Sequence, residues 1–174
     1  VLDYLDAGTR QAEVVLRKGT NEIHARSLWY ESTGPGRLGR IAAQGPGWIL
    51  AHTEDRPPRQ LHATWGKQLL VQPHEGQQVV SLSGNSRLTF GQLAGDRIDQ
   101  LGELSADEIH FWLFELPPDD STPAGQPRLR PDRMSALRNV RLNSPQLTGT
   151  VEELGIWFEQ EEPFDEQPAA AQVA

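Results

Sequence analysis

Two pairs of neighbouring acidic residues are the first candidates for chemistry in this chain of 174 residues. Asp107–Glu108 lies in the phrase LSADEIHFWLFEL (104–116), and Glu152–Glu153 lies in LTGTVEELGIWFEQ (147–160). Two converging carboxylates can act as general acid and general base. Neighbouring side chains on a strand point to opposite faces of the sheet, so we expect the members of each pair to point apart. The recurrence of the pair then indicates a repeat and not a catalytic site.

The histidines could supply metal ligands; they are His24, His52, His62, His74 and His110. A metal site needs two or three of them to converge with a carboxylate. His24 and His62 stand in the matching phrases Ile-His-Ala and Leu-His-Ala, which favours equivalent outward positions on two strands. We therefore expect no metal site, no cofactor and no catalytic residue.

Phosphate binding has two candidate sources in the sequence. The glycine-rich stretches at 34–37 and 45–47 lack the strand–loop–helix context of a phosphate-binding loop, so we interpret them as turns. Arginine binds phosphate well, and some basic side chains could meet lipid phosphates at the mouth of a groove. A solvated strand face with cross-strand ion pairs is the favoured interpretation of this basic set, which comprises Lys67, Arg87, Arg128, Arg130, Arg133, Arg138 and Arg141.

Composition narrows the class of protein. The net charge is −8, from 24 acidic and 16 basic residues, whereas nucleic-acid binding needs clustered Lys and Arg. The absence of cysteine excludes disulfides, thiolate chemistry and cysteine-ligated zinc. With 37% hydrophobic residues, the chain is long enough for one domain with a core. No apolar run reaches the roughly 20 residues that span a bilayer.

Short apolar or alternating runs separated by Gly, Pro, Asn and Asp predict an all-β fold. On one strand, Ile109, Phe111 and Leu113 should share one face while His110, Trp112 and Phe114 share the other. A strand that is apolar on both faces needs cover on both. We expect strands near 22–31, 38–44, 47–52, 60–71, 78–83, 86–91, 103–115, 132–137, 139–143, 146–150 and 153–159.

The strands repeat in pairs. A shorter phrase with a Gly or Asn turn occurs as AAQGPGWILA (42–51), SLSGNSRLTF (81–90) and SALRNVRLNS (135–144). Longer phrases with an aromatic residue near the end alternate with it: EIHARSLWYE (22–31), LHATWGKQLLVQP (61–73), LSADEIHFWLFEL and LTGTVEELGIWFEQ. One unit cannot bury its apolar face alone, so stacked units should share a continuous core.

Domain boundaries follow from the same pattern. We expect an N-terminal segment at 1–21 that forms a short helix or strand, and one β-domain at 22–160. A Pro-, Gly- and Ser-rich stretch at 117–127 should be a loop insert within that domain. The acidic end, 161–174, should be a disordered tail.

The repeated phrases resemble the OstA-like family of lipopolysaccharide-transport proteins, which includes LptA and LptC. The resemblance rests on SGN at 83–85, LSADEI at 104–109, ALRNVRL at 136–142 and LTG at 147–149, and it covers about residues 60–159 with a weaker echo at 22–52. Arg138 stands where the family has Gly, and Gly45-Pro46 stands where it has Gly-Asn. The aromatic strand ends at Trp29, Trp112 and Trp157 and the insert at 117–127 lie outside the family pattern, which indicates a divergent member.

The resemblance implies a repeat-built antiparallel β-jellyroll, folded like a taco, with an open hydrophobic groove. It further implies binding of an amphiphile's acyl chains in the groove. Inward apolar side chains on the expected strands are candidates for the groove lining, although ordinary core packing uses the same residues. They are Leu28, Ile41, Leu69, Val71, Val80, Leu82, Leu88, Phe90, Ile109, Phe111, Leu113, Val140, Leu142, Leu154, Ile156 and Phe158, with Ile49 and Leu147 in the wider set.

The resemblance leads to a functional expectation. The chain should be a non-enzymatic periplasmic module that binds or bridges lipopolysaccharide or a related amphiphile during outer-membrane biogenesis, anchored to a membrane, if at all, through a segment absent from this chain. Other OstA-like domains should be partners through end-to-end pairing of sheet edges. The alternative is a β-sheet scaffold for protein docking with a closed core and no lipid. A carbohydrate enzyme is disfavoured because the acidic pairs should not converge.

Overall fold

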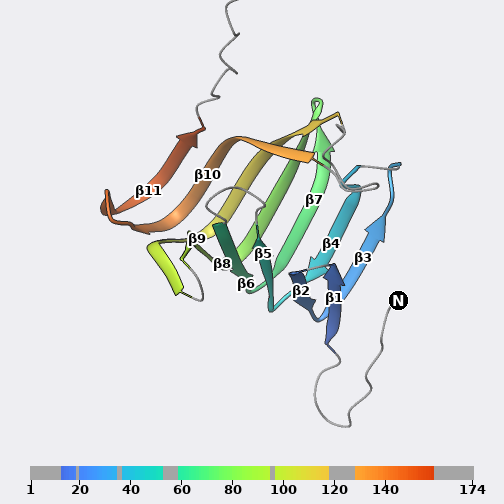
Figure 1. Cartoon of the computed structure of the whole chain (residues 1–174), viewed down its shortest axis with the longest axis horizontal. Coiled ribbons are helices and arrows are strands. Elements are labelled where there is room, and N and C mark those ends of the chain that lie inside the picture. The colour runs from blue at the N-terminus through green and yellow to red at the C-terminus, as the bar shows by residue number, and fades with distance from the viewer. Residues whose placement is uncertain are drawn as a thin grey trace, which may run out of the picture.

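The computed structural model describes residues 13–18, 20–34, 37–52, 59–94, 97–117 and 128–158, and within these ranges the only regular elements are eleven β-strands (Figure 1). None of the described residues belongs to a helix that could cross a membrane. The all-β prediction is confirmed. The strands are β1 (Val14–Lys18), β2 (Asn21–Ala25), β3 (Ser27–Glu31), β4 (Arg40–Gln44), β5 (Gly47–His52), β6 (Arg59–Trp65), β7 (Gln68–His74), β8 (Gln77–Ala94), β9 (Arg97–Leu116), β10 (Arg128–Asn143) and β11 (Thr148–Trp157).

All eleven strands belong to one antiparallel sheet that is not closed on itself. The hydrogen-bonded order is β1-β2-β5-β6-β8-β7-β4-β3, and β9, β10 and β11 continue the sheet from β8. Within the described residues, β1 pairs only with β2, β3 only with β4, and β11 only with β10. Among the described strands, the sheet therefore has three free edges, at β1, β3 and β11.

The sheet is folded into two layers because the long strand β8 changes partner halfway along its length. The first half of β8 pairs with β7 through Gln77–Ser83, and its second half pairs with β6 through Arg87–Gln92, while β9 follows both halves. Figure 1 shows β8, β9 and β10 curving from one layer into the other. We call the layer with β3, β4 and β7 layer A, the layer with β2, β5 and β6 layer B, and the line where they join the crease.

The repeated phrases of the sequence are the segments that cross the crease. EIHARSLWYE, LHATWGKQLLVQP, LSADEIHFWLFEL and LTGTVEELGIWFEQ cross from layer B to layer A, and AAQGPGWILA, SLSGNSRLTF and SALRNVRLNS cross back. Crossings from layer B to layer A therefore alternate along the chain with crossings from layer A to layer B. The prediction of a repeated strand unit is confirmed by this arrangement.

The crossings LSADEI and SALRNV differ in length. In LSADEI, two polar residues separate the buried Ala106 from the buried Ile109. In SALRNV, three residues separate the buried Ala136 from the buried Val140, and the extra residue is accommodated by positive φ angles at Arg138 (61°) and Asn139 (54°). The register shifts between Leu137 and Val140 at the same place, as expected for a β-bulge.

The SGN phrase at 83–85 makes the same kind of crossing. Gly84 and Asn85 have φ angles of 87° and 53°, and the pairing of β8 with β9 shifts register between Ser83 and Ser86. We expected a turn between two strands here. The structure instead keeps β8 continuous, because a bulge turns the chain across the crease without reversing it.

Small residues occupy the inner side of the crease. Ala25, Ala43, Ala63, Ala106 and Ala136 are each at most 4% exposed. The two layers are joined along this line, so the space between them is smallest there and larger side chains would force them apart. The alanine that recurs in the repeated phrases is therefore a packing requirement of the fold.

The structure describes only some parts of the expected domain segments. Residues 14–18, within the expected N-terminal segment 1–21, form β1 and pair with β2. A tight turn joins β7 to β8, with Glu75 and Gly76 at positive φ. Residues 118–127 of the expected insert and the expected tail at 161–174 lie outside the described residues.

Candidate functional site

One apolar cluster fills the space between the layers and contains most of the candidate groove residues. Leu69, Val71, Leu82, Leu88, Ile109 and Val140 are buried in it, and Leu28, Ile41, Val80, Phe111, Leu142, Leu154 and Ile156 are partly buried against it. Ile49 of the wider set also packs against the cluster. The cluster reaches from β3 at one end of the sheet to β11 at the other, so the apolar interior is continuous.

The centre of this interior is closed and its ends are less so. Leu82, Leu88, Ile109 and Val140, on three adjacent strands, are at most 3% exposed. Toward the free edges, Leu28 on β3 and Leu154 and Ile156 on β11 are only partly buried. Burial in the cluster is therefore most complete beside the crease on the central strands and less complete toward the free edges.

Four of the expected apolar residues lie outside the cluster. Phe90 is 37% exposed and lies opposite Gly102 on β9, and Phe158, just past β11, is 36% exposed. Leu147 is 58% exposed in the turn before β11, and Leu113 is of intermediate exposure on β9. The alternation of the strands placed Leu113 and Phe90 on the inner face, but both lie far from the crease, where the cluster thins out.

Several interior residues were not among our candidates. The buried Trp65, Leu104 and Met134 belong to the cluster together with the crease alanines. Met134 could have been found by extending the alternation from Val140, whereas alternation from Ile109 leads to Ser105 and not to Leu104. The role of Trp65 depends on glycine: a Cβ at Gly47 would lie 2.5 Å from the indole ring, so the ring fits only because Gly47 has no side chain.

A polar cap closes the interior where β9 ends. Glu115 continues the inward series of Ile109, Phe111 and Leu113, and its carboxylate oxygen Oε1 accepts hydrogen bonds from Leu38 N at 2.8 Å and Gln78 Nε2 at 3.1 Å. Gln78 is 4% exposed, so its amide needs such a partner. The cap ties the loop before β4 to β8 and β9.

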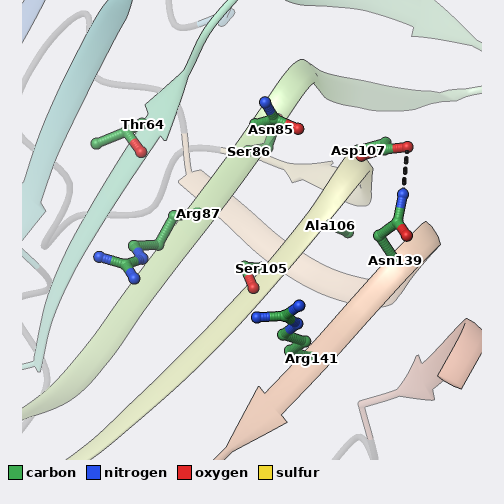
Figure 2. A pocket seen from close by; sticks show the side chains of 9 residues that line it. All are labelled: Thr64, Asn85, Ser86, Arg87, Ser105, Ala106, Asp107, Asn139 and Arg141. Atoms are coloured by element: carbon green, nitrogen blue, oxygen red, sulfur yellow. Dashed lines mark hydrogen bonds between the residues drawn. The ribbon is translucent and has the colours of Figure 1, made fainter. Parts of the chain in front are cut away.

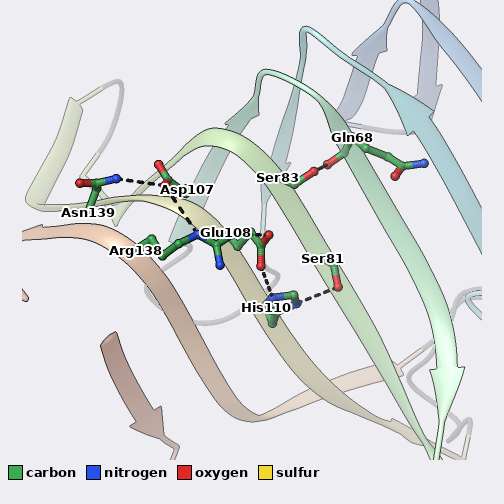
Figure 3. A network of polar contacts seen from close by, with 8 residues as sticks. All are labelled: Gln68, Ser81, Ser83, Asp107, Glu108, His110, Arg138 and Asn139. Carbon is green, nitrogen blue, oxygen red and sulfur yellow. Dashed lines mark hydrogen bonds and ion pairs between the residues drawn. The ribbon is translucent and has the colours of Figure 1, made fainter. Parts of the chain in front are cut away.

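The outer side of the crease carries a polar network (Figure 3). Arg138 bonds the Glu108 carboxylate at 2.5 Å and lies 3.8 Å from that of Asp107, while Asn139 donates to Asp107 at 3.0 Å. The hydrogen bond from Arg138 is the main cause that holds the pKa of Glu108 below its ordinary value. The expectation that Asp107 and Glu108 point apart is wrong, because the two-residue crossing between Ala106 and Ile109 turns both side chains outward.

The same network contains a Ser–His–Glu arrangement. Ser81 Oγ lies 2.9 Å from His110 Nδ1, and His110 Nε2 lies 3.6 Å from Glu108 Oε2. A nucleophile, a base and an orienting carboxylate make this pattern in acyl-transfer enzymes. Here Glu108 is engaged by Arg138, and Ser81 lies within a strand whose neighbours on both sides are paired, which leaves no turn to present oxyanion donors. The arrangement joins β8, β9 and β10 across the sheet.

Two arginines cover the outward aromatic residues of β9. The guanidinium of Arg133 lies 4.5 Å from the centre of the Trp112 ring, and that of Arg130 lies 5.4 Å from the centre of the Phe114 ring. Each arginine is the cross-strand partner of the ring it covers. The cover that this doubly apolar strand needs therefore comes from the neighbouring strand through cation–π contacts.

The histidines His24 and His62 lie on the outer face of layer B, on either side of Trp48. The ring of His24 stacks on Trp48 with a centroid distance of 3.8 Å, and that of His62 lies 5.8 Å from Trp48. The pKa of Glu22 is lowered, mainly by a hydrogen bond from His24 and next by one from Arg17. Among the described residues no three His, Asp or Glu side chains gather in the way that a metal site requires.

A pocket of about 510 Å³ opens beside the crease on the other side of the sheet from the apolar cluster (Figure 2). Its polar lining comes from four strands, because Thr64, Arg87, Ser105 and Arg141 stand at directly paired positions on β6, β8, β9 and β10. Asn85, Asp107 and Asn139 border it at the crease, where Ser86 and Ala106, which are buried on the inner side, also contribute to the lining. Sequence reasoning grouped Arg87 and Arg141 only as part of a basic population.

Arg87 and Arg141 differ in their partners. Arg87 forms an ion pair with Glu103 at 3.1 Å. Arg141 makes no ion pair within the described part of the chain, although the protein as a whole is acidic. The predicted cross-strand ion pairs of the basic set are thus present for Arg87 and Arg138 but not for Arg141.

Comparison with protein-family models, with curated proteins and with solved structures finds no match to this chain.

Proposed function

We propose that this chain is a non-enzymatic module of the OstA-like kind that binds an amphiphile, with the acyl chains entering the apolar interior between layers A and B. The observation that carries the proposal is the continuous apolar cluster from β3 to β11 inside a sheet that is not closed. An acyl chain gains roughly 0.8 kcal/mol for each CH₂ that it buries, so such an interior binds lipid without any polar recognition.

The proposal includes a route of entry. The interior is partly open at the β3 and β11 ends and packed at its centre, so an acyl chain would enter at an end and separate the layers as it advances. The crease would act as the hinge, because the layers are covalently continuous there and hydrogen-bonded along their strands. The cap formed by Glu115, Gln78 and Leu38 would limit the ligand at the far end of β9.

The biological setting is part of the same proposal. Lipopolysaccharide or a related amphiphile would be the ligand, the periplasm the compartment, and outer-membrane biogenesis the process. Other OstA-like domains would be partners, because the free edges of β3 and β11 offer unpaired backbone groups to a further strand. End-to-end pairing would extend one apolar interior into the next.

Native mass spectrometry of the protein purified from a Gram-negative envelope tests the proposal, with lipid extraction of whatever co-purifies. A bound amphiphile should be present, and it should be lost in Ile156→Asp, which places a charge on the inner face of β11. Trp157→Asp is the matched control, since the neighbouring Trp157 is 73% exposed. A clean apo mass and no uptake of added lipopolysaccharide or fatty acid would overturn the proposal.

A second candidate function is favoured by the closed centre of the interior. Because Leu82, Leu88, Ile109 and Val140 are at most 3% exposed, the domain could instead be a docking scaffold with an ordinary core, whose partner adds a strand to β11. Analytical ultracentrifugation over a wide concentration range separates the two. Self-association that is abolished by Thr150→Lys on the edge strand but kept in Thr89→Lys on the flanked β8, without any bound lipid, would favour the scaffold.

A further inference from the structure

We propose that the pocket beside the crease is a binding site for a small hydroxylated molecule carrying a phosphate or sulfate group. The site lies on the opposite face of the sheet from the apolar interior, so it is independent of the proposed lipid function. Its recognition elements are the two guanidinium groups of Arg87 and Arg141 and the hydroxyl of Ser105 between them (Figure 2).

The strand register places the two arginines on either side of one residue. Arg87 on β8 and Arg141 on β10 are both direct partners of Ser105 on β9. Adjacent strands lie roughly 4.8 Å apart, so the two arginine backbones are about 10 Å apart with Ser105 midway. A tetrahedral anion over Ser105 can therefore receive a hydrogen bond from the serine and charged hydrogen bonds from both sides.

Alternation fixes the face on which this row lies. Leu88, Leu104 and Val140 are the immediate neighbours of Arg87, Ser105 and Arg141, and all three are buried in the apolar cluster. The row therefore points to the opposite face of layer B. An anion bound there does not contact the apolar interior.

Arg141 is the arginine of the pocket lining that is available to an anion. Arg87 pairs with Glu103, whereas Arg138 is shared between Glu108 at 2.5 Å and Asp107 at 3.8 Å. Arg141 forms no ion pair among the described residues, in a protein whose net charge is −8. An anionic ligand would supply the missing partner, and arginine is the side chain best suited to bind the oxygens of phosphate or sulfate in pairs.

The rest of the lining indicates what carries the anionic group. Thr64, Asn85 and Asn139 offer hydroxyl and amide groups that both donate and accept hydrogen bonds, and no large apolar side chain lines the pocket. The volume of about 510 Å³ lies within the usual range for small-molecule sites. A phosphorylated or sulfated sugar fits this combination of charge, size and hydrogen-bonding capacity better than a bare ion does.

Isothermal titration at low salt with glucose 6-phosphate, glucose, inorganic phosphate and inorganic sulfate tests the inference on the whole chain. We expect saturable binding of glucose 6-phosphate and none of glucose. Arg141→Gln should weaken that binding about tenfold or more, because it removes charged hydrogen bonds to the ligand. Arg141→Lys keeps the charge without the paired donors, so its affinity for glucose 6-phosphate should lie between those of the wild type and Arg141→Gln.

Arg133→Gln is the matched control, since it removes an exposed arginine from the outer face of layer A. The thermal midpoint of Arg141→Gln should equal that of the wild type, because Arg141 is exposed and makes no ion pair in the described part of the chain. Amide shifts in a ¹H–¹⁵N spectrum should map the ligand to Asn85, Ser105 and Asn139.

The titrations distinguish a site for the inorganic anion from a site for a sugar phosphate, and they can also overturn the inference. Equal binding of inorganic phosphate and glucose 6-phosphate, lost in Arg141→Gln, would support an anion site that ignores the sugar. Tighter binding of the sugar phosphate would support the hydroxylated ligand. No saturable binding of any of the probes, or equal weakening in Arg141→Gln and Arg133→Gln, would overturn the inference.

Discussion

The two sides of the crease are built by the same residues of the chain in opposite ways. On the inner side, the alanines and Ile109 are almost inaccessible, and the spacing of inward residues is dictated by the closeness of the layers. On the outer side, the residues between successive inward positions include Asp107, Glu108, Arg138 and Asn139, which are joined in a polar network. At the crease, the inner side holds mostly small or apolar side chains, and the outer side holds mostly polar ones.

The difference teaches where function can vary in such a repeat. A change on the inner side alters the packing of both layers, so it acts on stability before anything else. A change on the outer side leaves the layers in place, which allows the pocket at Arg87, Ser105 and Arg141 to carry its own chemistry. The comparison predicts effects of unequal size for neighbouring residues of one strand.

Truncation of the inner side should have the largest effect. Ile109→Ala removes a fully buried side chain from the centre of the apolar cluster and should lower the free energy of unfolding by about 2–5 kcal/mol. Urea denaturation followed by tryptophan fluorescence measures the change. Thr150→Ala on the exposed edge strand should shift it by less than about 0.5 kcal/mol, and equal losses in the two variants would contradict the comparison.

Substitution of Gly84, in the SGN crossing, should have the next largest effect on stability. Gly84→Ala forces an alanine to φ 87° and places its Cβ 2.6 Å from the backbone nitrogen of Lys67, so we expect a loss of about 2 kcal/mol or more. Gly76→Ala in the β7–β8 turn has a similar φ of 81° and no atom within 4 Å of the new Cβ. It should lose only the conformational part, about 1 kcal/mol. Equal thermal midpoints for the two variants would show that the close approach at the crease has no effect.

The buried hydroxyl group of Ser86, on the inner side of the crease, should lower the free energy of unfolding. Ser86 is 0% exposed, and its Oγ has no hydrogen-bond partner in the described structure. Ser86→Ala should therefore raise the free energy of unfolding by about 1 kcal/mol, as measured by chemical denaturation. Ser105→Ala, on the opposite face of the neighbouring strand, is the control and should be near neutral. A loss of stability in Ser86→Ala would show that a bound water satisfies the hydroxyl.

Strand alternation and the repeated phrases were enough to predict the all-β fold and most of the apolar interior. They did not predict the outward turn of both Asp107 and Glu108, because alternation by two fails where the strand bends and the sequence does not state where the bend lies. The pocket was also beyond reach, since its members come from four strands and only the register brings Arg87 and Arg141 to either side of Ser105. An alanine was present in five of the seven phrases, but its role depends on how closely the layers approach.

The ion pair of Glu108 and Arg138 should give the smallest effect and the clearest dependence on pH. The hydrogen bond from Arg138 lowers the pKa of Glu108 in the folded protein below its ordinary value of 4.5. The pair therefore contributes stability above that ordinary value, and this contribution is lost as the pH falls through the lowered pKa of the folded state. Both side chains are partly exposed, so solvent screening limits the contribution to about 0.2–1 kcal/mol.

Carboxyl titration by NMR tests this prediction on the outer side of the crease. In Arg138→Gln the pKa of Glu108 should rise toward 4.5, and the stability difference from the wild type should vanish at a pH below the lowered pKa. Arg40→Gln, which removes a second exposed ion pair at Glu31, should leave the titration of Glu108 unchanged. If Arg138→Gln left that titration where it was, His110 or the local hydrogen bonds would control Glu108, and the polar network would hold the crossing through β8 and β9 rather than through β10.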